Sequence, residues 1–248
     1  MLTKEKTKQL WEASFAEQID LQAYNTTAVE AVVRTVSYHF RSHFSADGLK
    51  KLHFLEMGCG AGANLAWLAE KGVMVSGVDI SPTALKLARQ RLSRLGVGDR
   101  IGELLESSVD QVPFEDGACD GIVEACVFQH LAREERKKTF REVGRLLKPG
   151  GIFVGYMLDV GHTVFQDKQS EQLKEDPGTL ILTDGSSKIH LTNIGLSHFF
   201  RREEILDLLG GFSTVDPLLT TYELPECEAK KRGYSKYLQS MWTVFAVK

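Results

Sequence analysis

The chain lacks the cysteine pattern of a disulfide-rich or zinc-binding protein. Its four cysteines, Cys59, Cys119, Cys126 and Cys227, form no CxxC pair and have no histidines at metal-ligand spacing. Disulfide frameworks and structural zinc sites both depend on such spacing. We therefore expect reduced thiols, no metal site, and a reducing compartment.

The sequence also lacks an excess of one charge and any long apolar run. Its formal net charge is -3, from 30 Lys and Arg against 33 Asp and Glu residues. This balance gives no electrostatic reason to expect nucleic acid or an anionic membrane as a partner. No run reaches membrane-spanning length, and the N-terminus around Lys4, Lys8 and Trp11 lacks the apolar core of a signal peptide. We expect a cytoplasmic protein without a membrane segment.

The composition is that of an ordinary soluble globular protein. Hydrophobic residues make up 43% and charged residues 25% of the 248 positions. This length suits one large α/β domain with additions and leaves little room for two full domains.

The most informative segment is residues 52–65, where an apolar stretch leads into three alternating glycines. Glu56 precedes Gly58, Gly60 and Gly62, and a helix is expected to begin directly after them. Glycines at this spacing let a backbone approach a charged ligand closely at a helix start. A tight connection without any ligand has the same local pattern.

A second apolar run, residues 73–78, makes the glycine segment more specific. It ends in Asp79, about twenty residues after the glycines, where a ribose-binding carboxylate is expected at the tip of the neighbouring strand. A nucleotide-type cofactor requires this arrangement, in which a glycine turn follows one strand and an acidic residue ends the next.

Past Asp79 the pattern alternates between helix and strand. Ser81 and Pro82 are typical of an N-cap and a first helical position, and Gly96 is typical of a helix end. The segment Lys148-Pro149-Gly150-Gly151 predicts a helix terminator followed by a tight turn. The further predicted elements are a strand over residues 101–105, a strand over 120–125, a helix over 134–147 and a strand over 152–158.

Alternating units of this length predict a parallel sheet with helices on both faces, because parallel strands need right-handed crossover connections. Ligands of such sheets bind at the carboxyl ends of the strands. We therefore expect four segments to line one crevice, namely residues 58–62, Asp79, Ser108 and residues 124–125.

Four motifs carry a resemblance to a known family. They are Leu55-Glu56-Met57-Gly58-Cys59-Gly60-Ala61-Gly62, Val78-Asp79-Ile80-Ser81, residues 112–120, and Leu146-Leu147-Lys148-Pro149-Gly150-Gly151. Through them the chain resembles the class I S-adenosylmethionine-dependent methyltransferases, strongly over residues 50–158 and more weakly over 199–212 and 241–247. The resemblance implies a doubly wound, mostly parallel seven-stranded sheet with helices on both faces and an antiparallel last strand. It also implies S-adenosylmethionine as the cofactor.

The resemblance further implies roles for single residues. Glu56 and the glycine backbone would meet the methionyl end of the cofactor, Asp79 the ribose hydroxyls and Ile80 the adenine ring. Ser108 stands where the family often has an acid, and Asp110 follows two positions later. The implied cofactor-binding residues are Tyr24, Glu56, Gly58, Cys59, Gly60, Asn64, Asp79, Ile80, Ser108, Val109, Glu124 and Ala125.

A methyl group on a sulfonium is already an activated electrophile, so such an enzyme mainly aligns a nucleophile and excludes water. A base helps if the acceptor is a hydroxyl or a protonated amine, and histidine has a suitable pKa. His130 is the candidate catalytic base, with His162 and His190 as further candidates. Glu124, at a strand end, suits either the sulfonium region or a structural cap.

Two segments lie outside the strongest resemblance. Residues 1–49 are expected to form an N-terminal helical cap, in which Trp11 and Tyr24 would cover the cofactor, and residues 50–248 the cofactor-binding domain. Residues 159–197 are long and polar for a connection and are expected to form an inserted acceptor-side segment. Peripheral packing is the alternative for both.

Two other functions fit parts of the pattern. An NAD(P)-dependent oxidoreductase would also use Gly58, Gly60 and Asp79, although residues 113–114 and 148–151 suit it less well. A non-catalytic regulatory protein that binds S-adenosylmethionine would share the fold. Mild acidity and a modest cap favour a small-molecule acceptor over nucleic acid, while no motif identifies the accepted atom, the pathway or the oligomeric state.

Overall fold

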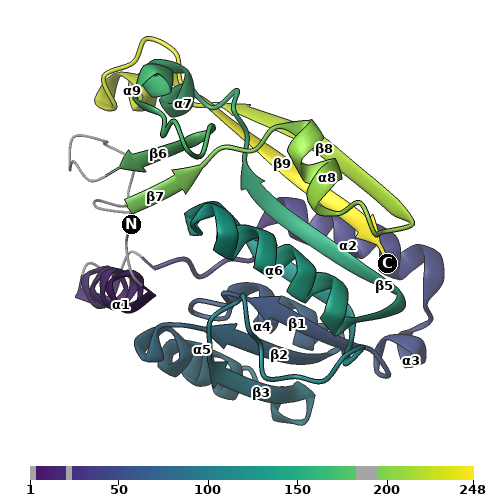
Figure 1. Cartoon of the computed structure of the whole chain (residues 1–248). Helices are drawn as coiled ribbons and strands as arrows, with labels where there is room; N and C mark the ends of the chain where they lie inside the picture. The colour runs from purple at the N-terminus through teal and green to yellow at the C-terminus, as the bar shows by residue number, and fades with distance from the viewer. Residues whose placement is uncertain (1–3, 21–23, 183–194) are drawn as a thin grey trace.

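The computed structural model describes residues 4–20, 24–182 and 195–248, and these contain a seven-stranded sheet (Figure 1). The strands are β1 (His53–Met57), β2 (Met74–Asp79), β3 (Ile101–Glu106), β4 (Cys119–Ala125), β5 (Leu147–Leu158), β8 (Thr214–Glu223) and β9 (Leu238–Val247). Their order in the sheet is β3-β2-β1-β4-β5-β9-β8. The first five run parallel, and β9 is antiparallel to both β5 and β8. The predicted fold class is confirmed, including the antiparallel last strand.

Helices cover both faces of this sheet. The described α-helices are α1 (Lys4–Asp20), α2 (Glu30–His43), α3 (Ala46–Leu49), α4 (Ala63–Glu70), α5 (Pro82–Arg94), α6 (Arg133–Leu146), α7 (Thr163–Lys168), α8 (Arg202–Leu208) and α9 (Glu226–Lys231). One apolar cluster joins the sheet to α2, α4 and α5, and another joins it to α6 and α8. Phe54 and Leu55, successive residues of β1, belong to different clusters because side chains alternate between the faces of a strand.

The start and end of α5 follow the predicted capping pattern. Ser81 is the N-cap, its hydroxyl oxygen accepts the N–H of Ala84 at 3.0 Å, and Pro82 follows it. Gly96 has a φ of +68°, the left-handed conformation typical of a residue just past a helix end. These caps fix the position of the helix start beside the carboxyl end of β2.

The prediction of a tight turn at residues 148–151 is wrong. α6 ends at Leu146, one residue before its predicted end, and β5 begins directly after it and shifts register against β4. The N–H of Gly150 donates to the carbonyl of Lys248 at 2.9 Å, and the N–H of Lys248 donates to the carbonyl of Gly151 at 3.0 Å. Pairing with the distant end of β9 therefore holds this segment as a bulged strand.

The segment after β5 builds a second, smaller sheet and core. β6 (Thr179–Leu182) and β7 (Gly195–His198) pair antiparallel, and both lie near α1 at the left of Figure 1. A third apolar cluster joins this sheet to α7 and α9 and contains Val164, Phe165, Leu180, Leu182, Phe199, Ala229 and Tyr237. Residues 183–194 lie outside the described part of the chain, so the expected insert at 159–197 is described only in part.

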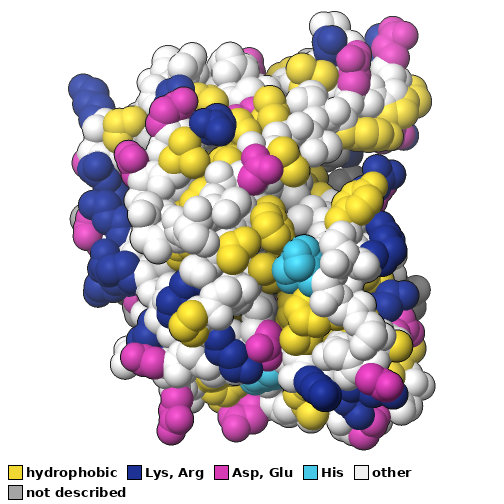
Figure 2. Space-filling view, turned by 90° about the vertical axis from the view of Figure 1, so that its right-hand side faces the viewer, with side chains coloured by type: hydrophobic (Ala, Val, Ile, Leu, Met, Phe, Trp, Pro, Cys, Tyr) yellow, Lys and Arg dark blue, Asp and Glu magenta, His cyan; other side chains and the backbone are white. Residues whose placement is uncertain are grey.

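Among the described helices, none has the length and apolar character needed to cross a bilayer. Figure 2 shows a face on which basic and acidic side chains occur together, with hydrophobic groups between them. Lys and Arg side chains gather along the left edge of this face, with a few acidic side chains among them.

Candidate active site

A cavity of about 650 Å³ lies at the carboxyl ends of the parallel strands. Its walls come from the loops that follow these strands, from α1, and from the segment after β5. A volume of this order is typical of a small-molecule site. Of the residues expected from the sequence, those that line it are Trp11, Glu56, Gly58, Cys59, Gly60, Asn64, Asp79, Ile80, Ser108, Val109, Ala125, His130 and His162.

The three alternating glycines form the connection from β1 to α4. Gly58, Gly60 and Gly62 have φ values of +79°, +50° and +74°, which other residues rarely adopt. A Cβ on Gly58 would lie 2.4 Å from a methyl carbon of Val127, and one on Gly60 would lie 3.4 Å from a ring carbon of Phe15. The missing side chains therefore let this turn pass close to the loop after β4 and to α1.

Glu56 is a buried carboxylate with one unsatisfied oxygen. Its side chain is 2% exposed, and its Oε1 accepts a hydrogen bond from Nδ2 of Asn64 at 2.7 Å. The Asn64 carbonyl oxygen in turn accepts the N–H of Val29 at 2.8 Å, which fixes the orientation of the amide. Oε2 of Glu56 has no hydrogen-bond partner among the described residues. Burial raises the pKa of Glu56 to about 8, against the hydrogen bond from Asn64, which lowers it.

Asp79 ties the glycine turn to the start of α5. Its Oδ2 accepts the N–H of Gly60 at 2.8 Å, and its Oδ1 accepts the N–H of Ser81 at 2.9 Å. Burial raises the pKa of Asp79 above its usual value, although these backbone hydrogen bonds oppose the shift. Each carboxylate oxygen retains a lone pair for a further donor. Ile80, next in the chain, also lines the cavity.

Ser108 and Val109 lie where the chain leaves β3. The Ser108 hydroxyl donates to Oδ1 of Asp110 at 2.5 Å. Asp110 lies two positions after Ser108, the position at which the family often has an acid. This hydrogen bond links the two side chains directly. Val109 is 5% exposed and contributes an apolar side chain to this part of the wall.

Tyr24 and Glu124 are the two members of the expected cofactor set that do not line the cavity. Tyr24 is half-buried, and its neighbour Asn25 takes the place at the wall. Glu124 is completely buried and accepts N–H hydrogen bonds from Val127, Phe128 and Tyr156 at 3.1, 3.3 and 2.9 Å. Of its two expected roles, the geometry favours a structural cap, since the carboxylate is occupied by backbone donors from two neighbouring segments.

Helix α1 forms a cover that the sequence pattern predicted only in outline. Trp11, which was expected to cover the cofactor, lines the cavity together with Phe15 of the same helix. Lys8 pairs with Glu106 at the end of β3, with 2.5 Å between Nζ and Oε1. Glu12 accepts hydrogen bonds from Ser81 and from Thr83 at the start of α5. No local sequence signal marks Lys8 or Glu12, because their partners lie about 70 to 100 residues away along the chain.

His130 lies in the cavity wall with both ring nitrogens engaged. It ends a short 3-10 helix, η2 (Phe128–His130), and its ring packs edge-on against Trp11 at 5.1 Å between centroids. Gln129 accepts the N–H of Leu158 through Oε1, so its Nε2 donates to Nε2 of His130 at 3.3 Å. The ring proton is thereby assigned to Nδ1, which donates to the carbonyl of Leu196 at 2.9 Å. Burial lowers the pKa of His130 to about 4, which disfavours a role as a general base.

His162 lines the β5 side of the cavity and caps α7. Its Nδ1 accepts the N–H of Val164 at 3.2 Å, so a neutral ring carries its proton on Nε2. Burial lowers the pKa of His162 to about 4. The third histidine candidate, His190, lies outside the described residues.

Ser197 is a cavity residue that the sequence did not reveal. It lies in β7, is 1% exposed, and its hydroxyl has no hydrogen-bond partner among the described residues. A serine in a short strand has no local signature that distinguishes an unpartnered hydroxyl from a satisfied one. Its recognition depends on the three-dimensional placement of the segment after β5.

Cys126 follows β4 at the cavity wall in an unusual conformation. Its φ of 61° makes it the one non-glycine with positive φ within the described ranges. Burial raises the pKa of its thiol to about 12, so it is not a thiolate near neutral pH. The part of the chain that is described also has no group of three metal-ligating side chains.

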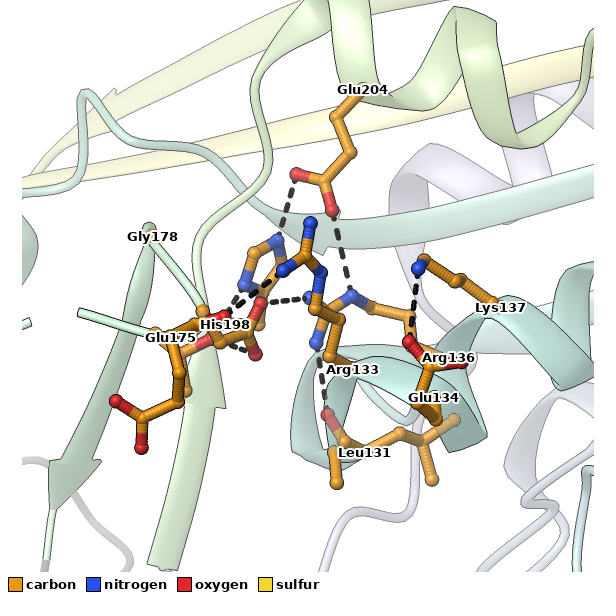
Figure 3. A network of polar contacts seen from close by, with 12 residues as sticks. Leu131, Arg133, Glu134, Arg136, Lys137, Glu175, Gly178, His198 and Glu204 are labelled. Atoms are coloured by element: carbon orange, nitrogen blue, oxygen red, sulfur yellow. Dashed lines mark hydrogen bonds and ion pairs between the residues drawn. The ribbon is translucent and has the colours of Figure 1, made fainter. Parts of the chain in front are cut away.

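A buried ionic network holds the segment after β5 against α6 and α8 (Figure 3). Arg136 is 2% exposed, and its Nη2 donates to Oδ1 of Asp176 at 2.8 Å. Its Nε lies 3.6 Å from Oε1 of Glu204. His198 links Oε2 of Glu204, at 2.8 Å from its Nε2, to the hydroxyl of Thr179, at 2.7 Å from its Nδ1. Both strands of the small sheet are therefore anchored beside the cavity.

Comparison with known proteins identifies the central part of the chain. Residues 55–155 match a family described as a methyltransferase domain. This stretch contains the glycine turn, Asp79, and the strand ends β1 to β4 that line the cavity.

Two relatives of known activity match parts of the sequence. The chain is 28% identical over 123 residues to the Sterol 4-C-methyltransferase strm-1 of Caenorhabditis elegans, a match that covers 50% of this chain and 35% of that protein. It is 29% identical over 175 residues to the Sarcosine/dimethylglycine N-methyltransferase of Halorhodospira halochloris, covering 70% of this chain and 56% of that protein. The chain thus spans from a third to little more than half of the length of these relatives.

Solved structures share the fold over nearly the whole chain. The magnesium protoporphyrin IX methyltransferase of Synechocystis PCC 6803, solved with bound S-adenosylhomocysteine, has a TM-score of 0.66 at 17% identity and covers 99% of this chain and 100% of its own. An S-adenosylmethionine-dependent methyltransferase of Methanosarcina mazei has a TM-score of 0.65 at 22% identity, covering 85% and 96%.

The fold is therefore that of the class I S-adenosylmethionine-dependent methyltransferases. Within it, residues 55–155 match the methyltransferase-domain family. Both findings confirm the resemblance that the four sequence motifs carry.

Proposed function

We propose that this protein is an S-adenosylmethionine-dependent methyltransferase that methylates a small molecule. The observation that carries the proposal is the unpartnered Oε2 of Glu56 at the wall of the cavity beside the glycine turn. A buried carboxylate without a full set of donors is costly, and a cationic ligand would satisfy it. S-adenosylmethionine carries an ammonium group at its methionyl end and a sulfonium at its centre.

The described residues fit this cofactor from end to end. Glu56 would bind the methionyl ammonium, and Asp79 would accept hydrogen bonds from the ribose through its remaining lone pairs. Ile80 and Val109 would pack against the adenine, with Ser108 at its edge. When bound, the cofactor supplies a methyl group already activated for displacement.

The task left to the protein is to orient the acceptor and exclude water. α1 covers one side of the cavity, and the small sheet after β5 bounds the other. His130, the predicted base, is better suited to position the loop after β4 against β7, because its Nε2 is engaged and burial lowers its pKa.

Two further observations support a small-molecule acceptor and a reducing compartment. The relatives and the solved structure described above are named for a sterol, for sarcosine and dimethylglycine, and for magnesium protoporphyrin IX, all of them small molecules. All four cysteines are free thiols, which supports a reducing compartment such as the cytoplasm.

Calorimetric titration with S-adenosylmethionine, S-adenosylhomocysteine and NAD tests the proposal. We expect binding of the first two and none of NAD. The substitution Asp79→Asn should weaken binding at least tenfold, while Asp99→Asn, on the exposed surface, should leave it unchanged. Binding of NAD alone, or equal affinity in Asp79→Asn and the wild type, would overturn the assignment.

A further inference from the structure

The β5 side of the cavity differs chemically from the side that holds Glu56 and Asp79. Apolar side chains dominate its wall, and they come from the end of β5 and the segment that follows. They are Leu158, Val164, Leu182 and Phe199. Two polar side chains, His162 and Ser197, are set among them.

Ser197 is the first sign that this wall binds a ligand. Its hydroxyl is buried at 1% exposure and has no partner among the described residues. A buried hydroxyl without a partner lowers stability, so such groups are few and usually have a functional reason. A ligand oxygen in the cavity would supply the missing hydrogen bond.

His162 can make a second polar contact, in which it acts as the hydrogen-bond donor. Its Nδ1 accepts the N–H of Val164, so the neutral ring presents an N–H at Nε2. Burial lowers the pKa of His162, which keeps the ring uncharged near neutral pH. This side chain can therefore donate to an oxygen or nitrogen lone pair without adding a charge.

The charged side chains around the cavity disfavour an anionic acceptor. Among the described lining residues, Lys8 is the one Lys or Arg, and it is paired with Glu106 at the β3 side. Glu135, near His130, adds a carboxylate whose Oε2 accepts the N–H of Ala132 at 3.2 Å. Among the described residues of the apolar wall there is neither a Lys or Arg to pair with an anion nor an Asp or Glu to pair with a cation. Burial of either charge against this wall would therefore be costly.

We propose that the acceptor is an uncharged, mainly apolar molecule whose oxygen atoms hydrogen-bond to Ser197 and His162. The apolar wall would bind its hydrocarbon or aromatic body, and the two polar groups would fix its orientation. This inference rests on the proposed methyltransferase function, because it assigns the remaining half of the same cavity to the acceptor.

Three probes with the same ring system test the charge preference. They are 2-naphthol, uncharged near neutral pH, 2-naphthoate, which is anionic, and 2-naphthylmethylammonium, which is cationic. Each is titrated calorimetrically into the full chain saturated with S-adenosylhomocysteine. We expect 2-naphthol to bind at least tenfold more tightly than either charged probe.

Three substitutions test the contacts. Ser197→Ala should weaken 2-naphthol binding about tenfold, which corresponds to about 1.4 kcal/mol. Thr243→Val is the matched control, because Thr243 also has a buried, unpartnered hydroxyl but does not line the cavity. His162→Asn keeps an N-cap for α7, removes the ring N–H, and should weaken binding of the same probe.

The outcomes separate this inference from the proposed function. Failure of S-adenosylhomocysteine to bind would overturn the function itself. If it binds, then tighter binding of either charged probe, equal affinity for all probes, or no detectable binding of 2-naphthol would overturn the uncharged acceptor. Equal effects of Ser197→Ala and Thr243→Val on probe affinity would overturn the role of Ser197.

Discussion

Ser81 donates its hydroxyl hydrogen to Glu12 at 2.5 Å while its oxygen accepts the N–H of Ala84 at 3.0 Å. One side chain thus caps α5 and anchors α1 at the same point. The cover of the cavity is therefore linked to the helix start that also positions Asp79.

Removal of the Glu12 carboxylate should loosen this cover. Burial alone would raise the pKa of Glu12, but the hydrogen bonds from Ser81 and Thr83 outweigh it and hold the pKa below its usual value. In Glu12→Gln, we expect hydrogen exchange in α1 to be several-fold faster and S-adenosylhomocysteine to dissociate faster. Glu17→Gln, an exposed position on the same helix, is the control. Unchanged exchange in both variants would contradict the anchoring role.

The same contact should depend on pH. A carboxylate with a lowered pKa stabilises the folded arrangement above its unfolded pKa and loses that contribution as pH falls through the lower, folded pKa. The protection factors of the α1 amides in the wild type, which correct for the pH dependence of the intrinsic exchange rate, should therefore fall on acidification below about pH 4.5. Glu12→Gln should lack this fall.

Binding of the cofactor should release a proton from Glu56. With a pKa of about 8 in the free protein, this carboxyl is mostly protonated near neutral pH, and a neighbouring ammonium favours its ionised form. Calorimetric binding enthalpies should therefore differ between buffers of low and high ionisation enthalpy. Glu56→Gln should remove this difference and weaken affinity. A wild-type enthalpy that is independent of the buffer would contradict the prediction.

The raised pKa of Glu56 also sets the sign of a stability effect. The folded protein keeps a proton that the unfolded chain loses above about pH 4.5, so this group lowers the free energy of unfolding progressively up to about pH 8. The stability of Glu56→Gln relative to the wild type should therefore rise across this window, by up to about 1.4 kcal/mol per unit of the pKa difference. Urea unfolding at pH 5 and at pH 8 measures the difference.

Disruption of the Arg136–Asp176 pair should be strongly destabilising. In Arg136→Met, Asp176 would remain buried without its main cationic partner, and we expect a loss of about 3–5 kcal/mol in urea unfolding. The double variant Arg136→Met/Asp176→Asn should recover part of this loss. Arg34→Met breaks the exposed pair with Glu30 and should cost less than about 1 kcal/mol. Equal costs for the two single variants would contradict the importance of burial.

Two glycines of similar backbone conformation should respond differently to alanine. Gly62 and Gly96 have φ values of +74° and +68°, so each substitution carries a similar strain of about 1–2 kcal/mol. A Cβ on Gly62 would lie 3.1 Å from Cα of Ala88, whereas Gly96 has no atom within 4 Å. Gly62→Ala should therefore lose clearly more stability than Gly96→Ala. Similar thermal unfolding of the two variants would show that α4 and α5 can separate without cost.

His130 should remain neutral well below physiological pH. With a pKa of about 4, its imidazole resonances should not titrate between pH 8 and pH 5 in an NMR experiment. The same ring in the urea-unfolded chain should titrate near pH 6.5. A folded-state midpoint near 6.5 would restore His130 as a candidate base.

The sheet and its cofactor side were predictable because their signals are local. The glycines at 58, 60 and 62, the acid at Asp79 and the Ser81-Pro82 cap each specify a backbone conformation within a few residues. Residues 148–151 were misinterpreted since glycine and proline favour turns and bulges alike. Pairing with Lys248 decides between them, and no local pattern contains that partner.

The wall formed by the loop after β4 and by the segment after β5 had weaker sequence signals. Glu124 could be a ligand or a cap until the N–H groups of Val127, Phe128 and Tyr156 were placed around it. Ser197 gave no sequence signal, because an unpartnered hydroxyl is a property of its surroundings.

Both α1 and the small sheet of β6 and β7 lie outside residues 55–155, yet each supplies part of the cavity wall. Neither adds a strand to the seven-stranded sheet. A substitution in β6 or β7 can therefore reshape the cavity without touching the strands that hold Glu56 and Asp79. A substitution of Lys8 or Glu12 in α1 would in contrast also disturb the end of β3 or the start of α5.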